Sequence, residues 1–140
     1  MKSSARNQLT GIIHSIEDFS GCHSIAVQCG KHLVYSHISP PAYRSLKPQI
    51  GQNAVVLFKA NAITLFTEIH PLRLSAENSL EARVEAIEQG AVNNIVRLRT
   101  DDGFTLAAAI TLNSSESLDI CAGQRITAVF LASQTMLAIL

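Results

Sequence analysis

The sequence predicts an all-β protein made of two tandem OB-like five-stranded β-barrel repeats, each with one short helical turn. The first observation is internal similarity: SARNQLTGIIHSIE from Ser4 aligns with SAENSLEARVEAIE from Ser75. The second is that LKPQIGQNAVVLFKANAITL from Leu46 aligns with LDICAGQRITAVFLASQTML from Leu118, with a Gly-Gln pair in each copy. Similarity at a fixed spacing indicates duplicated structural units. We assign the first repeat to residues 1–68 and the second to residues 73–140, with a joint at 69–72.

The elements of one repeat follow from its alternation and turn residues. Strands are expected within VEAIEQGAVNNIVRLRT, which alternates apolar and polar residues from Ile95 to Leu98, and the turn Asp101–Gly103 leads to a strand in FTLAAAIT. TLNSSESLDI begins with capping residues and predicts a short helical turn. CAGQ turns the chain, and RITAVFLA and TMLAIL end the copy as strands. In the first copy ISPPAYRSLKPQIG takes the helical position, where prolines suit a first turn.

Composition fixes the class of protein. The chain has 140 residues, of which 47% are hydrophobic and 16% charged, as expected for a folded core rather than a disordered chain. A unit of about 65 residues is marginal alone, so we expect two small closed barrels that pack against each other. No apolar run approaches the roughly 20 residues of a membrane helix, and the N-terminus lacks a secretion signal. Three cysteines without a C-x-x-C pair indicate reduced thiols and a cytoplasmic protein.

The two halves differ in charge. Residues 1–70 hold six basic and three acidic residues, a net charge of +3, whereas 71–140 hold five basic and eight acidic residues, a net charge of −3. A nucleic-acid-binding protein usually carries a basic surface over its whole domain, so we expect no nucleic-acid partner and no membrane partner. The first half remains open to a small anion.

Two cations distinguish the first copy from the second. Arg6 is replaced by Glu77 and Lys59 by Leu131, so the fold requires neither charge. Their joint loss indicates one shared purpose, although an isolated SARN can also be a polar leader before a strand. Arg, Lys, hydroxyls and backbone amides together make a donor-only cage. Such a cage suits a dehydrated tetrahedral dianion such as molybdate, tungstate or sulfate, whereas phosphate at neutral pH carries a proton and needs an acceptor.

These residues resemble a known family. S-A-R-N-Q-L at the start, a turn in the middle and a final F-K-A strand are similar to the molybdate-binding Mop domain, also called molbindin or TOBE-like, and two tandem copies resemble the di-Mop proteins. The resemblance implies a cytoplasmic homo-oligomer, a dimer or trimer, which holds molybdate or tungstate between barrels for storage or homeostasis. It implies that the oxyanion-binding residues include Ser4, Ala5, Arg6, Asn7, Ser39, Lys59, Ala60 and Asn61, with the hydroxyls of Thr111, Ser114 and Ser133 added from the second copy.

The chain also departs from the family pattern. Ala42 replaces a serine of the first middle turn, and the second copy lacks both cations. We therefore expect fewer strong sites than two complete copies would give, with the second copy supplying only hydroxyls and packing. No helix-turn-helix segment is evident, which argues against a complete transcription regulator.

The sequence also bears on other possible functions. The alternatives are a ligand-sensing or accessory regulatory module without a DNA-binding domain, and an oligonucleotide-binding OB-type module, which the few aromatic residues disfavour. No catalytic motif is present, so no enzymatic activity and no catalytic residue are expected. Cys22, His23, Cys29 and His32 match no zinc spacing, so no direct metal ligand is expected.

Overall fold

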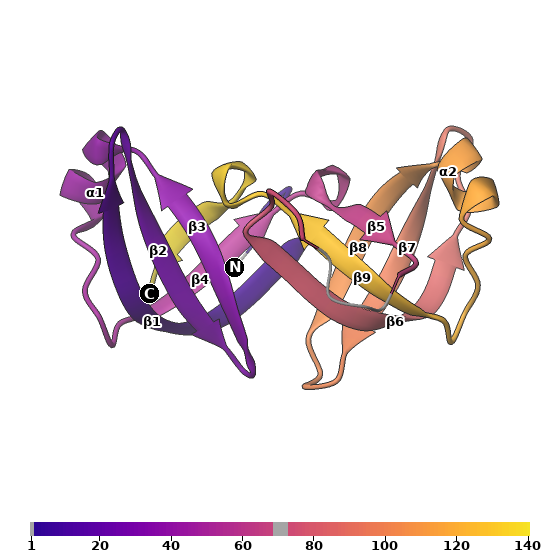
Figure 1. The fold of residues 1–140 in the computed structure, drawn as a ribbon, viewed down its shortest axis with the longest axis horizontal. Coiled ribbons are helices and arrows are strands. Elements are labelled where there is room, and N and C mark those ends of the chain that lie inside the picture. The colour runs from indigo at the N-terminus through magenta and orange to yellow at the C-terminus, as the bar shows by residue number, and fades with distance from the viewer. Residues whose placement is uncertain (1, 69–72) are drawn as a thin grey trace.

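The computed structural model describes residues 2–68 and 73–140, and it consists of two five-stranded antiparallel sheets that lie side by side (Figure 1). The predicted joint, 69–72, lies outside the described residues. The elements of the first repeat are β1 (Asn7–Phe19), β2 (Cys22–Cys29), β3 (His32–Ile38), α1 (Pro40–Leu46), β4 (Asn53–Phe58), the 3₁₀ turn η1 (Ala60–Ala62) and β5 (Thr64–Phe66). Those of the second are β6 (Asn78–Glu88), β7 (Asn93–Thr100), β8 (Thr105–Thr111), α2 (Leu112–Ser117), β9 (Arg125–Phe130), η2 (Ala132–Gln134) and β10 (Met136–Ile139).

The predicted strands and helical turns are present, and the all-β class is confirmed. Period-two alternation is clearest in β6, where buried and exposed residues alternate from Asn78 to Glu85 before the pattern breaks near the end of the strand. The capping signals also hold: Ser39 accepts a hydrogen bond from the Ala42 amide, and Thr111 accepts one from the Ser114 amide. The sequence did not predict η1 and η2, which are single turns of three residues each.

The sheets exchange their last strands, which the sequence did not predict. The strand orders are β10-β4-β1-β2-β3 and β5-β9-β6-β7-β8, so each repeat gives its final strand to the other sheet. In Figure 1 the yellow C-terminal strand accordingly lies beside β4 in the first sheet. The exchange follows from η1 and η2, which carry the chain across from one sheet to the other.

The expected closed barrels are not seen. Each sheet is curved, but among the described residues no ladder joins β3 to β10 or β8 to β5. The edge strands β8 and β3 are each bonded at one residue by an asparagine side chain of the other repeat. Asn7 Nδ2 donates to the Ala107 carbonyl at 3.0 Å and its Oδ1 accepts from the Ala107 amide at 2.7 Å, which pairs the edge of β8 at this residue. Asn78 does the same at Tyr35 on β3.

The core is shared between the repeats. A single apolar cluster includes residues from β1 to β4 and from β6 to β9. At its centre Phe58 and Phe130 stack with ring centroids 4.0 Å apart, and both are buried. The repeated Gly-Gln pairs hold the bulges of β1 and β6. Gly51 and Gly123 have φ near +90° and donate to the carbonyls of Ile13 and Val84.

Candidate functional site

A cleft lies where the first repeat crosses the second sheet. It has a volume of about 280 Å³ and is open to solvent on one side. Its lining from the first repeat consists of Ser4, Arg6, Lys59, Ala60 and Asn61, and its lining from the second consists of Asn93, Ile95 and Ala109. Because β5 joins the second sheet, the turn η1 packs over β8, and this packing makes one wall of the cleft.

Arg6 and Lys59 face each other at the end of a ladder. The last hydrogen-bonded register pair of β1 and β4 is Asn7 with Phe58, and Arg6 and Lys59 are the next residue on each chain. Both side chains are exposed, and neither forms an ion pair among residues 2–68 and 73–140. Two cations that line one cleft favour an anion between them.

A backbone donor lies beside this pair. Lys59 is in an extended conformation, and Ala60 begins η1 and is 8% exposed. Within the described part of the chain, no hydrogen bond to the Ala60 amide is found. A buried N–H group without a partner is costly, so a ligand that accepts a hydrogen bond there is favoured. The cleft therefore offers positive charge and donors together.

The other residues of the first pentapeptide position the site. Ala5 is 3% exposed and packs with Val55 and Leu57. Asn7 is fully buried, and both polar groups of its side chain are bonded to Ala107, so its amide does not reach the cleft. The segment is thereby fixed at two buried points on either side of Arg6. In the second copy Asn78 is likewise buried and bonded to the backbone of Tyr35, whereas Ala76 is only half-buried.

The predicted hydroxyls lie outside the cleft lining. Thr111 is the ladder partner of Asn93, and its hydroxyl donates to Ser114 Oγ at 2.9 Å at the start of α2. Ser39 caps α1 next to the first sheet, and Ser133 lies on η2. The structure thus brings Ser4, Arg6, Lys59, Ala60 and Asn61 together, and it places the four hydroxyl residues and Asn7 elsewhere.

Sequence reasoning missed the second wall of the cleft. Asn93, Ile95 and Ala109 lie on β7 and β8, and no local motif marks them. Their position depends on the crossing of η1 over the second sheet. Tandem alignment alone cannot reveal that crossing, because it treats each copy as a self-contained unit.

A basic pocket adjoins the cleft and shares Arg6 with it. Its other charged residues are Glu85, Arg97 and Arg99, and each of these arginines has an acidic partner. Arg97 is paired with Glu88 at 2.6 Å, and Arg99 with Glu85. The cations of this pocket are therefore largely neutralised, in contrast to Arg6.

The cysteines and histidines show no competing centre. Within the described residues, no three His, Cys, Asp or Glu side chains are grouped to hold a metal ion. Burial, with a smaller contribution from Asp102, raises the pKa of the Cys29 thiol to about 12, so it stays protonated. None of the described helices is long and apolar enough to cross a membrane.

Comparison with known proteins shows which family this chain belongs to. A profile of the TOBE domain matches residues 3–65 and 74–137, which is most of each repeat. The chain belongs to the TOBE domain family. The resemblance to molbindin and Mop domains is thereby confirmed.

The TOBE chain is similar to several characterised proteins. A crystal structure of the cytoplasmic molybdate-binding protein ModG, in a form with molybdate bound, superposes with a TM-score of 0.94 at 29% identity and covers 100% of both chains. The molybdenum transport protein ModE of Herbaspirillum seropedicae is 35% identical over 99% of this chain and 52% of its own length. The molybdenum-pterin-binding protein MopB of Rhodobacter capsulatus is 33% identical over 64% of this chain and 33% of its own length. This chain spans about half the length of the ModE relatives.

Proposed function

We propose that this TOBE protein is a cytoplasmic oxyanion-binding protein, not an enzyme, that holds molybdate or tungstate in the cleft between Arg6 and Lys59. The observation that carries the proposal is one cleft in which, among residues 2–68 and 73–140, Arg6 and Lys59 have no ion pair and the Ala60 amide has no hydrogen bond. The likeness to ModG, a molybdate-binding protein, supports this ligand. Storage or homeostasis of molybdenum is the simplest role for binding without chemistry.

The chemistry of the cleft favours a fully deprotonated tetrahedral dianion. Arg6 supplies a planar fork of donors, Lys59 a compact charge, and Ala60 a fixed amide. Ser4 and the side-chain amide of Asn61 can add donors from the same lining. Arg6, Lys59 and the Ala60 amide can only donate, and none of the described residues that line the cleft is a carboxylate, so a fully deprotonated dianion fits better than hydrogen phosphate, whose proton needs a strong acceptor.

We further propose that the chain forms a homo-oligomer, a dimer or a trimer, with the oxyanions at interfaces between copies. The open side of the cleft supports this, because a second copy can cover it and exclude water. Ser39 caps α1 in the first sheet, away from the cleft, and reaches an oxyanion only from another copy. The hydroxyls of Thr111 and Ser114 lie beyond Asn93 at the same end of the second sheet.

Calorimetric titration of charge variants tests the site. Arg6→Glu and Lys59→Leu each introduce the residue found in the second repeat. Each should weaken molybdate binding by about 2–5 kcal/mol, because the bound anion loses one of its charged hydrogen-bond partners. Arg44→Glu and Lys31→Leu are matched controls, since both residues are exposed and lie outside the cleft lining. Equal molybdate affinity in the parent and both cleft variants would refute the assignment.

A sensing or accessory regulatory role is the second candidate. It is favoured by similarity to the regulators, because the DNA-binding transcriptional dual regulator ModE of Escherichia coli is 29% identical over this whole chain and 53% of its own length. In that role the oxyanion would change binding to a partner protein. Co-purification in the presence and absence of molybdate separates this role from storage.

A further inference from the structure

The second repeat contains a place equivalent to the oxyanion cleft, and Glu77 reaches into it. Asn78 pairs with Phe130 as Asn7 pairs with Phe58, so Glu77 and Leu131 take the positions of Arg6 and Lys59. The turn η2 follows Leu131 as η1 follows Lys59. The two places are thus built on the same backbone and differ in their side chains.

The carboxylate of Glu77 is bonded to the backbone donor of that turn. Glu77 Oε1 accepts a hydrogen bond from the Ala132 amide at 2.9 Å, and Ala132 is fully buried. The corresponding amide in the first repeat, that of Ala60, has no such partner in the described chain. A carboxylate oxygen is the closest side-chain equivalent of an oxyanion oxygen. Glu77 therefore occupies the position that the proposed ligand takes beside Ala60.

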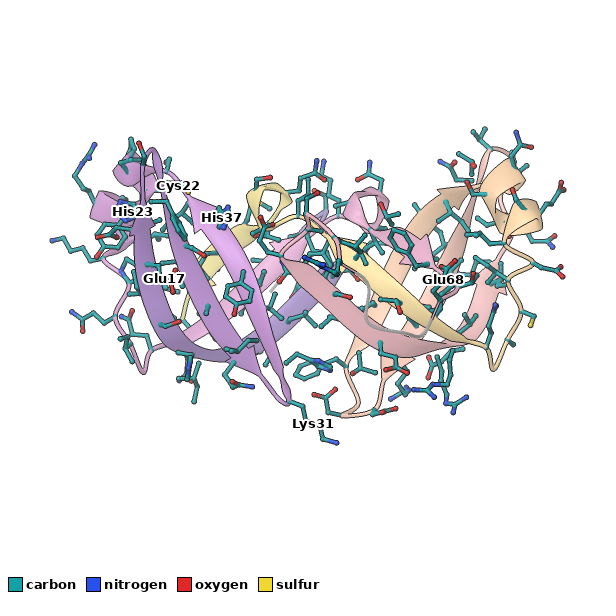
Figure 2. The ribbon with its side chains drawn as sticks, in the orientation of Figure 1. Glu17, Cys22, His23, Lys31, His37 and Glu68 are labelled. Carbon is teal, nitrogen blue, oxygen red and sulfur yellow. The ribbon has the colours of Figure 1, made fainter. Side chains whose placement is uncertain are left out.

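The surroundings of Glu77 exclude a free anion. It lines a pocket of about 470 Å³ with a second carboxylate and neutral or weakly basic side chains, and no Lys or Arg is part of the lining. The pocket is lined by Glu17, Phe19, Cys22, Ser24, Tyr35, His37 and Glu77. Figure 2 shows Glu17, Cys22 and His37 together on the first sheet. Two carboxylates without a cation repel a dianion.

We propose that Glu77 is a built-in substitute for the oxyanion in the second repeat. This proposal rests on the proposed function. It means that the turn η2 of the second repeat always has the arrangement that η1 takes with a bound ligand, and that the second repeat binds no free oxyanion. Each chain then has one site that binds a free oxyanion, the cleft of the first repeat. The first repeat responds to the ligand, while the second provides a fixed frame.

The first arm of the test restores the second site. The double variant Glu77→Arg, Leu131→Lys reproduces the cation pair of the first repeat, and we expect it to double the number of molybdate ions bound per chain in calorimetry. An unchanged stoichiometry in a folded double variant would overturn the inference. If the parent protein itself binds no molybdate, the proposed function fails, and that result is distinct from this one.

The second arm measures amide hydrogen exchange by NMR and does not require the double variant to fold. In the parent, the Ala132 amide should be protected with or without molybdate, and the Ala60 amide should become protected only when molybdate is added. Glu77→Ala should remove the protection of Ala132, whereas Glu77→Gln, which retains an acceptor oxygen, should preserve most of it. Protection of Ala132 in Glu77→Ala equal to that in the parent would overturn the proposal.

Discussion

At the scale of single residues, the doubled pentapeptide combines two tasks. Its Asn is structural in both copies, because Asn7 and Asn78 each bond the edge strand of the opposite sheet, and its Ala is buried in the first copy. Its third position is free to vary, since it lies just beyond the ladder and faces solvent. Arg at this position lines the cleft proposed to bind an oxyanion, and Glu accepts a hydrogen bond from the Ala132 amide.

Within the first pentapeptide, Asn7 is the residue whose loss should lower the stability most. Asn7→Ala removes both side-chain partners of the partly buried amide and carbonyl of Ala107, so we expect it to lower the free energy of unfolding by about 1–3 kcal/mol. Asn78→Ala should have a similar effect through Tyr35. Urea unfolding followed by circular dichroism measures both. Ser79→Ala, at the exposed neighbouring position, is the control. Stability of Asn7→Ala equal to that of this control would contradict the role given to Asn7.

Arg6 and Lys59, which the sequence singles out as oxyanion-binding candidates, line one cleft, whereas the candidate Asn7 does not. Arg6 and Lys59 stood out because the second copy lacks both, a contrast that one sequence can show. Asn7 looked like a ligand because it belongs to the motif. Its true contact, with Ala107, spans one hundred residues and depends on the arrangement of the two sheets.

At the scale of elements, the β2–β3 and β7–β8 hairpins meet at their turns. Asp102 accepts from the Lys31 amide at 2.9 Å and lies 3.2 Å from His32 Nε2. Lys31 is labelled at this tip in Figure 2. Gly30 has φ +58°, where a side chain would be strained, and a Cβ atom there would come within 2.4 Å of Asp102 Oδ2 and displace this carboxylate. This contact joins the two sheets on the side away from η1 and η2.

The Asp102 contact predicts a defined pH dependence. Burial alone would raise the pKa of Asp102, but hydrogen bonds from Thr100 and Lys31 and the proximity of His32 outweigh it and hold the pKa below its ordinary 3.8. A lowered folded pKa means that the ionised carboxylate stabilises the protein above about pH 4 and that this stabilisation is lost as the pH falls through the folded value.

The variant Asp102→Asn should therefore be less stable than the parent at pH 7 by about 1–3 kcal/mol. The difference should shrink as the pH is lowered below about 4. Denaturant unfolding at several pH values measures it, and Asp101→Asn, an exposed neighbour, is the control. A difference that stays constant down to pH 2 would show that the charge of Asp102 contributes nothing.

The strands themselves were predictable, but their partners were not. Alternation in β6 and turn residues such as Gly103 have local causes. The exchange of β5 and β10 depends on where η1 and η2 direct the chain, and turns of three residues leave little trace in composition. For the same reason the expected closed barrels are replaced by open sheets.

At the scale of the whole molecule, the two repeats form one cooperative unit. They share one apolar cluster, exchange strands, and stack Phe58 on Phe130. We expect a single thermal transition in which the calorimetric and van't Hoff enthalpies agree. Phe58→Ala and Phe130→Ala should each lower the stability of the entire chain by about 3–5 kcal/mol. Two separate transitions, each moved by only one of these variants, would contradict a shared core.

We propose above that an oxyanion binds in the cleft formed by Arg6, Lys59 and Ala60. The most direct measurement is a crystal structure of the unaltered protein with tungstate, located by the anomalous scattering of tungsten. The account predicts a strong peak in this cleft, with oxygen atoms within hydrogen-bond distance of the Ala60 amide, and no peak beside Glu77. A peak beside Glu77, or none in the cleft at saturating tungstate, would contradict it.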